Sequence, residues 1–377
     1  IRHSGTESAG FVSMMRVVLA GGGTAGHVNP LLAVADELVR QGEASPSDIF
    51  VIGTAEGLEA RLVPDAGFAL GSIARLPFPR RMSAQALLFW PRFIGAVLAS
   101  IRMIRAHQPD VVAGFGGYVS APVYVAAWLA RVPLVIHEAN AVPGFANRWG
   151  ARLTSHVVTT FSLTKLPGAR LLGMPMARRI THPKSPPTLS SAREHFGLSP
   201  RKKTLVVTGG SQGSVAINST VQAVVGDILA AGWQVLHIVG QRNPLPAPET
   251  PGYVTLAYCD RMDLAFAAAT AVVSRAGAAT VSEIQLLGLP AVFVPYPVGN
   301  GEQEKNAWDS LQAGSAVLVL DADFTPEYVR ATVLPLLGDD QALARMCERA
   351  RGLGRADAAT AFVQVMKDAL ADQRKAA

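Results

Sequence analysis

Val17-Val-Leu-Ala-Gly-Gly-Gly-Thr-Ala-Gly-His27 is the stretch that decides the fold, because it recurs as Leu205-Val-Val-Thr-Gly-Gly-Ser-Gln-Gly-Ser214 about half a chain later. Each copy is a short apolar run, typical of a buried parallel strand, followed by clustered glycines and a helix-like segment. Glycines let backbone N–H groups approach a phosphate, and a helix N-terminus adds partial positive charge. Two such units predict two α/β domains facing one cleft, with a phosphorylated ligand between them.

Composition agrees with this organisation. The chain has 377 residues, 49% hydrophobic and only 16% charged, which favours two well-buried domains. Its net charge of +6 fits an anionic small substrate or an acidic membrane surface. The sequence lacks the aromatic-basic interleaving that reads bases, which disfavours nucleic acid. Its two cysteines, Cys259 and Cys347, lie far apart, as expected in a reducing cytoplasm. No uncharged apolar run reaches the ~18–20 residues of a membrane-spanning helix.

Strands and helices alternate along the chain, which predicts doubly wound parallel sheets with right-handed crossovers. We expect residues 1–13 to be an upstream extension, 14–175 an N-terminal domain, 176–200 a Pro- and Ser-rich linker, and 201–377 a C-terminal domain. The expected strands are 16–20, 49–52, 111–113, 134–136, 156–159, 204–208, 234–239, 253–257, 271–274, 291–294 and 316–320. The expected helices include 30–41, 121–130, 214–231, 278–287 and 302–313.

Gly21–Gly26 contains the G-x-G-x-x-G dinucleotide fingerprint, which also needs an acidic residue closing the second strand. Here that strand ends in Gly53-Thr54, and the next carboxylate is Glu56 in the following loop. A glycine turn around another phosphate is therefore favoured over NAD. His27 follows the turn, at a helix start, and suits a general base because imidazole titrates near neutral pH. The alternative is a histidine that only packs or caps the helix.

Further polar and glycine clusters follow other strands of the N-terminal half. Gly114-Phe-Gly-Gly-Tyr118 is either a tight connection or a backbone-lined wall for an acceptor. His137-Glu-Ala-Asn140 follows the apolar strand 134–136, and packing alone explains such a cluster poorly. Because ligands bind at the carboxyl ends of parallel strands, both clusters are candidate site residues.

The C-terminal half carries a second set of candidates. Ser211 and Gln212 lie in its glycine loop, and Glu283 lies in the second turn of the helix after Ser274-Arg-Ala-Gly277, where a carboxylate suits a ribose diol. The alternative for Glu283 is a helix-dipole carboxylate. Asp321-Ala-Asp323 matches a metal-holding D-x-D pattern, although helix capping explains it better. We expect a metal-free site.

One segment has the composition of a membrane contact. Aromatic side chains with neighbouring arginines suit an interface with anionic lipid, and ordinary helix packing is the alternative. The candidate residues are Phe78, Arg80, Arg81, Phe89, Trp90 and Arg92.

Taken together, these motifs resemble the MurG family of N-acetylglucosaminyltransferases, in glycosyltransferase family 28. The matching stretches run in order from residue 16 to about 310, and all of them together are specific. They are 21–27, 114–120, 137–140, 209–213, 274–283 and 302–303. The resemblance implies a GT-B fold of two Rossmann-like domains. It also implies inverting, metal-independent transfer of GlcNAc from UDP-GlcNAc to the C4 hydroxyl of the muramoyl sugar of lipid I, which gives lipid II.

The resemblance also assigns roles. Ser211 would meet the donor diphosphate, the backbone of Cys259 the uracil, and Glu283 the ribose. Gln303 with Asn140 would hold the GlcNAc. The other donor-binding residues would be Thr24, Ala25, Gly26, Gln212, Ala278, Ala279 and Thr280. The acceptor-binding residues would be Gly22, Gly23, Gly116, Gly117, Tyr118 and His137. His27 resembles the proposed general base, and Glu138 is its rival.

The chain departs from the family at one place. The family commonly shows Gly-x-Pro-x-Arg before the linker, whereas Gly173-Met-Pro-Met-Ala177 has alanine there, so Arg178 is the candidate replacement. The resemblance implies no cofactor, lipid I as acceptor, and a cytoplasmic protein peripheral on the inner face of the cell membrane, with cell-wall synthesis and division proteins as further partners. The alternatives are a glycolipid glycosyltransferase, a UDP-GlcNAc 2-epimerase, or a nucleotide-binding module without catalysis.

Overall fold

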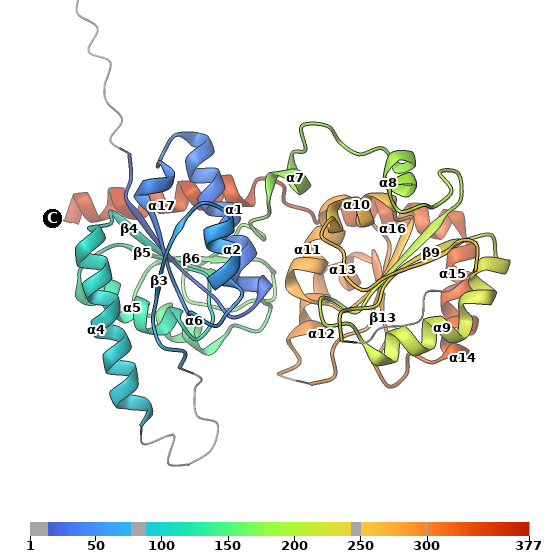
Figure 1. Cartoon of the computed structure of the whole chain (residues 1–377), viewed down its shortest axis with the longest axis horizontal. Helices are drawn as coiled ribbons and strands as arrows, with labels where there is room; N and C mark the ends of the chain where they lie inside the picture. The colour runs from blue at the N-terminus through green and yellow to red at the C-terminus, as the bar shows by residue number, and fades with distance from the viewer. Residues whose placement is uncertain (1–13, 77–87, 243–249, 299, 377) are drawn as a thin grey trace, which may run out of the picture. The chain divides into compact units, whose positions relative to one another are not determined.

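The computed structural model describes residues 14–76, 88–242, 250–298 and 300–376. The expected upstream extension, residues 1–13, lies outside them. The chain divides into two compact units, one with residues up to Ile136, Trp149–His156 and Phe362–Ala377, the other with His137–Arg148 and Val157–Ala361. Two parallel sheets with helices on both faces form the α/β fold (Figure 1).

The first sheet has seven strands in the order β3-β2-β1-β4-β5-β6-β7. The glycine-loop strand β1 lies in its interior, pairing in parallel with β2 on one side and β4 on the other. All four residues of β1 are buried, which explains its uninterrupted apolar sequence. The strands are β1 Val17–Ala20, β2 Ile49–Gly53, β3 Ala69–Ser72, β4 Val111–Gly114, β5 Leu134–Glu138, β6 His156–Thr159 and β7 Ala169–Leu171.

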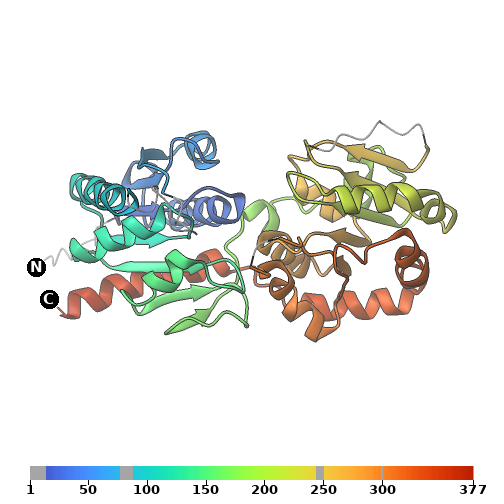
Figure 2. The same cartoon turned by 90° about the horizontal axis from the view of Figure 1, so that it is seen from below.

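Helices from both ends of the chain accompany this sheet (Figure 1, Figure 2). They are α1 Ala25–Gln41, η1 Pro46–Asp48, α2 Glu59–Asp65, α4 Phe89–His107, α5 Ser120–Leu129, α6 Phe145–Gly150 and the last helix, α17 Ala358–Ala376. The Phe362 ring of α17 lies 5.3 Å from that of Phe115, and Lys367 pairs with Glu43. Apolar and charged contacts therefore bind the end of the chain to the N-terminal sheet.

The second sheet has six strands in the order β10-β9-β8-β11-β12-β13. Its strands are β8 Thr204–Thr208, β9 Gln234–Ile238, β10 Tyr253–Leu256, β11 Ala271–Ser274, β12 Ala291–Phe293 and β13 Ala316–Leu318. Its helices are α7 Arg178–Thr181, α8 Leu189–His195, α9 Val215–Ala230, α10 Met262–Ala268, α11 Ala278–Leu287, α12 Glu302–Asn306, α13 Trp308–Ala313, α14 Pro326–Tyr328, η2 Val329–Val333, α15 Leu334–Gly338 and α16 Asp340–Arg351.

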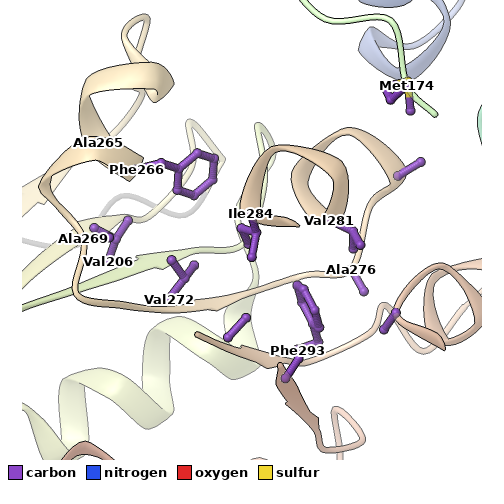
Figure 3. Packing of buried hydrophobic residues seen from close by; sticks show 14 of the residues in the cluster. Met174, Val206, Ala265, Phe266, Ala269, Val272, Ala276, Val281, Ile284 and Phe293 are labelled. Atoms are coloured by element: carbon purple, nitrogen blue, oxygen red, sulfur yellow. The ribbon is translucent and has the colours of Figure 1, made fainter. Parts of the chain in front are cut away.

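Successive side chains of β8 pack into two different apolar clusters, one on each face of the sheet. Val206 belongs to a cluster with Phe266 of α10 and Ile284 of α11, which Figure 3 shows. Its neighbours Leu205 and Val207 belong to a second cluster, together with residues of α9 and α15. Because successive side chains of a strand point to opposite faces, an uninterrupted apolar strand is covered by helices on both sides.

The expected linker, residues 176–200, lies within the second unit. Arg193 of α8 is buried and donates hydrogen bonds to the carbonyl oxygens of Ala268 and Pro200 and to the hydroxyl of Thr270. A buried guanidinium with three oxygen acceptors holds α8 firmly against the β11 side of the sheet. The boundaries that the sequence suggests for the domains stay a prediction.

Every strand expected from the sequence is present, and two were missed. β3 and β7 are edge strands of four and three residues with half-exposed side chains, so they lack an apolar run. Several bounds differ, and the three largest differences near the site are these. β5 extends to Glu138 rather than ending at Ile136, α1 begins at Ala25 rather than Pro30, and the helix expected over 302–313 is two short helices, α12 and α13.

Candidate active site

The glycine loops after β1 and β4 meet at the carboxyl edge of the first sheet. Gly117 has φ +87°, and a β-carbon there would lie 2.5 Å from the carbonyl oxygen of Gly22. Gly23 has φ +89°. Only glycine combines a positive φ with so close a backbone approach. The structure therefore brings together Gly22, Gly23, Gly116 and Gly117, which the sequence assigned to the acceptor.

A buried carboxylate that no local sequence pattern indicates lies beneath the first loop. Glu59, the first residue of α2, is fully buried, and its Oε2 accepts the N–H of Gly23 at 2.8 Å. Its Oε1 accepts the N–H of Thr54 at 3.0 Å and the Thr54 hydroxyl at 2.6 Å. Burial raises the pKa of Glu59, but these hydrogen bonds outweigh it and leave the pKa below its ordinary value. The carboxyl is therefore ionised at neutral pH.

His27 lies in the first turn of α1, half-buried. Its Nδ1 is 3.1 Å from the carbonyl oxygen of Gly22 and 3.1 Å from the Thr24 hydroxyl. Because a carbonyl oxygen only accepts, Nδ1 carries the proton in the neutral ring and Nε2 keeps its lone pair. Burial lowers the pKa of His27, opposed by the Gly22 hydrogen bond and by the charge of Glu59. The ring is thus neutral at physiological pH and is able to accept a proton at Nε2.

Glu138, the rival base, is occupied by its own loop. Oε1 accepts the N–H of Asn140 at 2.9 Å, and Oε2 accepts the N–H of Gly144 and the amide of Asn147, both at 2.9 Å. Burial raises the pKa of Glu138, and these donors oppose the rise. Three N–H donors on one buried carboxylate are the arrangement of a side chain that shapes a loop.

His137 and Glu138 belong to β5, whereas the sequence analysis expected them to follow the strand. The side chain of His137 is fully buried, with Nε2 3.2 Å from the Thr160 hydroxyl and 3.4 Å from the carbonyl oxygen of Gly173. In contrast, Tyr118 is 45% exposed. Of the proposed acceptor residues, Tyr118 is therefore open to a ligand and His137 is held within the protein.

The second glycine loop lies between β8 and α9, directly before the N-terminus of a long helix. Ser214 caps α9, its Oγ accepting the N–H of Ile217 at 3.3 Å. Gly210 and Gly213 have φ of +83° and +79°, which a side chain would strain. Ser211 and Gln212 are exposed at this helix start. The exposed loop and the positive end of a 16-residue helix fit a diphosphate.

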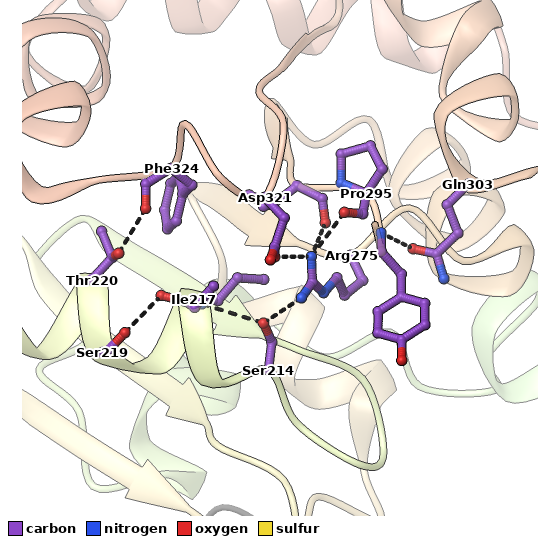
Figure 4. Close-up of polar contacts among 12 residues, drawn as sticks. Ser214, Ile217, Ser219, Thr220, Arg275, Pro295, Gln303, Asp321 and Phe324 are labelled. Atoms are coloured by element: carbon purple, nitrogen blue, oxygen red, sulfur yellow. Dashed lines mark hydrogen bonds and ion pairs between the residues drawn. The ribbon is translucent and has the colours of Figure 1, made fainter. Parts of the chain in front are cut away.

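Arg275 joins this loop to the next strand end, a contact that no local sequence pattern predicts (Figure 4). Its guanidinium donates to Oγ of Ser214 at 2.6 Å and to the carbonyl oxygens of Val294 and Pro295 at 3.0 and 2.8 Å. It also forms an ion pair with Asp321. One buried side chain thereby ties the ends of β8, β11 and β12 together.

The Asp321 pair corrects the interpretation of Asp321-Ala-Asp323 as a helix cap. Asp321 pairs with Arg275, and the cap of α14 is Thr325, whose hydroxyl accepts the N–H of Tyr328. The local sequence pattern favoured capping, but a long-range ion pair decided the role of this carboxylate. Among the described residues, no group of three His, Cys, Asp or Glu side chains is placed to hold a metal ion.

Tyr296 connects Arg275 to Gln303. The Tyr296 ring lies 5.6 Å from the Arg275 guanidinium carbon, within cation–π range. The Tyr296 N–H donates to Oε1 of Gln303 at 3.0 Å (Figure 4). The predicted diphosphate loop and the predicted GlcNAc residue are therefore mechanically linked.

Glu283 lies on α11, whose first turn contains Ala278, Ala279 and Thr280. Burial raises the pKa of Glu283 to about 7, opposed by the charge of Arg179 and assisted by that of Asp263. The hydrogen bond from Arg261 is the main cause that lowers the pKa of Asp263, and the charge of Arg179 lowers it further. The arginine whose field reaches Glu283 is therefore Arg179, next to the expected Arg178. Cys259, buried, lies on the loop between β10 and α10.

An exposed apolar surface lies at the start of α4. Trp90, Ile94 and Leu98 are 63%, 57% and 48% exposed, spaced four residues apart on one helix face. The rings of Phe89 and Phe93 pack on Trp90, and Arg92 is exposed beside them. Phe78, Arg80 and Arg81 lie outside the described residues. Within the described part of the chain, no helix has the length and apolar character needed to cross a membrane.

Comparisons with known proteins identify the family of both halves of the chain. The family model of the glycosyltransferase family 28 N-terminal domain matches residues 17–159, and that of the family 28 C-terminal domain matches residues 204–362. A protein of Clavibacter sepedonicus, named UDP-N-acetylglucosamine--N-acetylmuramyl-(pentapeptide) pyrophosphoryl-undecaprenol N-acetylglucosamine transferase, is 51% identical over 94% of this chain and 97% of its own. A protein of the same name from Leifsonia xyli subsp. xyli is 51% identical, over 95% and 99% of the two chains.

Solved structures give the same result. The chain is similar to Acinetobacter baumannii MurG, with a TM-score of 0.76 and 28% identity, over 93% of this chain and 99% of that one. It also matches a putative UDP-N-acetylglucosamine 2-epimerase of Listeria monocytogenes, with a TM-score of 0.66 and 13% identity, over 95% and 97% of the chains. The second match shows a shared fold alone.

Proposed function

The chain belongs to glycosyltransferase family 28, and we propose that it transfers GlcNAc from UDP-GlcNAc to the C4 hydroxyl of the muramoyl sugar of lipid I, with inversion and without a metal ion. It is an N-acetylglucosamine transferase of peptidoglycan synthesis. The observation that carries this function is the end-to-end likeness to relatives of that name, at 51% identity. The site residues keep the roles that the sequence suggested, as proposals.

The C-terminal half binds most of the donor. The diphosphate lies on the exposed loop of Ser211 and Gln212, where the positive end of the α9 dipole balances its charge. The backbone of Cys259 contacts the uracil and Glu283 the ribose. Gln303, held by Tyr296, and Asn140 bind the hydroxyls of GlcNAc. The loop and helix dipole also stabilise the negative charge that develops on UDP as it leaves.

The N-terminal half supplies the base. The acceptor hydroxyl attacks the anomeric carbon on the side opposite UDP, so a new C–O bond forms as the bond to the diphosphate breaks. His27 Nε2 takes the hydroxyl proton, because Nδ1 is already protonated toward Gly22. Tyr118, exposed beside the glycines, is the acceptor contact. A single displacement of this kind inverts the anomeric centre.

The decisive experiment follows labelled GlcNAc from UDP-GlcNAc to a lipid I analogue with EDTA present. Lipid-linked product with an inverted linkage is the expected result. Activity that EDTA abolishes and Mg²⁺ restores would contradict metal independence. Turnover of UDP-GlcNAc without any acceptor would favour the alternative, a UDP-GlcNAc 2-epimerase, and transfer to a different lipid would favour a glycolipid glycosyltransferase.

Glu283→Gln is expected to weaken UDP binding and to stabilise the free protein. An ionised carboxyl accepts from both ribose hydroxyls, so UDP affinity of the natural protein should rise with pH through about 7, and the variant should bind roughly tenfold more weakly without that dependence. The pKa of Glu283 is about 7 in the folded protein and 4.5 ordinarily. Because the unfolded chain releases this proton first, the natural protein loses stability as the pH rises from 4.5 to 7.

At pH 8 the free energy of unfolding of the same variant should therefore be about 1–3 kcal/mol higher, with a higher melting temperature. At pH 5 its stability should change little. Calorimetry and thermal melts at the two pH values measure both effects. The exposed Glu348→Gln on α16 is the matched control and should change neither. Equal pH dependence of UDP binding in the natural protein and the Glu283 variant would refute the ribose role.

We propose that the enzyme works as a peripheral protein on the cytoplasmic face of the cell membrane, through the α4 surface. The double change Trp90→Ala and Ile94→Ala should reduce binding to anionic vesicles about tenfold or more, because it removes two exposed apolar side chains that would be buried in the lipid. Arg92→Glu should weaken binding mainly at low salt. Leu189→Ala, 47% exposed on α8, is the control in vesicle sedimentation. Unchanged sedimentation of the double variant would place the membrane contact elsewhere.

A further inference from the structure

We propose that Glu59 is a positioning residue for His27, acting through the single peptide group that joins Gly22 to Gly23. The proposal rests on the function proposed above, in which His27 is the general base. Glu59 does not touch the ring, and it comes from a different segment of the chain. Its influence passes along one amide.

The two ends of that amide carry the two contacts. The N–H of Gly23 donates to Oε2 of Glu59 at 2.8 Å, and the carbonyl oxygen of Gly22 lies 3.1 Å from Nδ1 of His27. The carbonyl of one residue and the N–H of the next form one planar, resonance-coupled unit. A carboxylate that accepts from the N–H end polarises the unit and makes its carbonyl a stronger acceptor. Glu59 thereby favours the tautomer that carries the proton on Nδ1.

Several segments of the chain leave room for the Glu59 side chain. A β-carbon on Gly22 or on Gly57 would overlap the carboxyl group itself. A β-carbon on Gly53 would lie 2.6 Å from Cγ of Glu59. Thr54 then fixes Oε1 with two hydrogen bonds, and its hydroxyl accepts the N–H of Gly57 at 3.1 Å. Three glycines and a threonine around one buried carboxylate make a site built for that group.

The arrangement solves a difficulty in using a buried histidine as a base. Burial lowers the pKa of His27, and so weakens it as a proton acceptor. The charge of Glu59 and the Gly22 carbonyl both act in the opposite direction. Catalytic histidines often hold a carboxylate directly at Nδ1, and here a peptide group stands between the two. The imidazolium that forms during transfer is stabilised by the same polarised carbonyl.

The other charges of α2 do not share this role. Arg61 and Asp65 pair with each other at 3.5 Å on the exposed side of the helix. The loop after β4 adds glycines and the exposed Tyr118. Asp65→Asn is consequently a matched control for Glu59→Gln, since each removes one carboxylate from the same helix.

Glu59→Gln should lower kcat about 10–100-fold, by analogy with the loss of a hydrogen-bond partner of a metal-bound histidine. The affinity for UDP-GlcNAc should stay within twofold. The lower limb of the kcat/KM pH profile should move to lower pH, because a charge that raises the His27 pKa is lost. Ring ¹⁵N shifts in NMR should report the same fall in pKa and more of the Nε2–H tautomer. Asp65→Asn should match the natural protein in all four measurements.

The double variant His27→Ala with Glu59→Gln provides the second test. If Glu59 acts through the ring, the glutamine should cost little more once His27 is gone. Unchanged ring pKa and kcat in Glu59→Gln would overturn the positioning role and leave the base intact. Full turnover of His27→Ala would instead overturn the base, and the ring measurement, which needs no turnover, tells the two failures apart. Should Glu59→Gln not fold, Thr54→Val, which removes the hydroxyl hydrogen bond to Oε1 and keeps that of the residue's N–H, should shift the ring in the same direction by less.

Discussion

Replacing His27 with alanine is expected to lower kcat roughly 10²–10⁴-fold, the usual contribution of a positioned general base. The neutral ring keeps Nδ1 protonated toward Gly22, so Nε2 is the atom that accepts the acceptor's proton. UDP-GlcNAc affinity should change little, because the donor diphosphate, ribose and uracil are assigned to the C-terminal half. Steady-state transfer to a lipid I analogue and calorimetric titration of the donor measure the two quantities separately.

Glu138→Gln gives the comparison that distinguishes the two candidate bases. Its carboxylate accepts three N–H donors from the 140–147 loop, so the variant should lose thermal stability as well as activity. His27→Ala should keep its melting temperature within a few degrees, since the ring is only half-buried. Near-normal turnover of His27→Ala, together with a lost pH limb in Glu138→Gln, would move the base to Glu138.

The fold could be predicted from the sequence where buried strands consist of uninterrupted apolar residues. The strands β1 and β8 are fully buried, so each appears in the sequence as an uninterrupted apolar run, which is typical of a parallel sheet. β3 was missed because its four residues, Ala69 to Ser72, are half or fully exposed at a sheet edge and carry no apolar run. β5 was ended too early because His137 and Glu138 are polar, although both are buried within the strand.

The residues of the candidate site also fall into those that a local sequence motif suggests and those that it does not. Residues such as Ser211 and Glu283 stay predictions, which rest on the rule that segments following parallel strands share the carboxyl edge of the sheet. Glu59 and Arg275 were missed because partners distant in sequence determine their roles. Glu59 lies three positions beyond Glu56, the carboxylate first considered, and only the folded loop shows that Gly22, Gly53 and Gly57 leave space for it. No local motif records such a contact.

Arg275→Met should produce the second large effect, a fall in donor affinity of about 10–100-fold. The methionine has similar length but leaves Ser214 without its guanidinium donor and removes the cation that faces the Tyr296 ring. The start of α9 and the segment holding Gln303 would then no longer be fixed relative to each other, and preorganised binding would be lost. The natural contacts are a fork of donors, so Arg275→Lys should restore charge but not affinity.

Stability must be separated from binding in this experiment. Arg275→Met leaves Asp321, 20% exposed, without its partner, which should cost roughly 2–4 kcal/mol of folding free energy. Adding Asp321→Asn removes the orphaned charge and should recover much of that loss in thermal melts. The donor affinity of the double variant should stay low, because neither substitution restores the bond to Ser214. If the double variant binds UDP-GlcNAc as tightly as the natural protein, Arg275 only stabilises the fold, and the diphosphate loop is positioned without it.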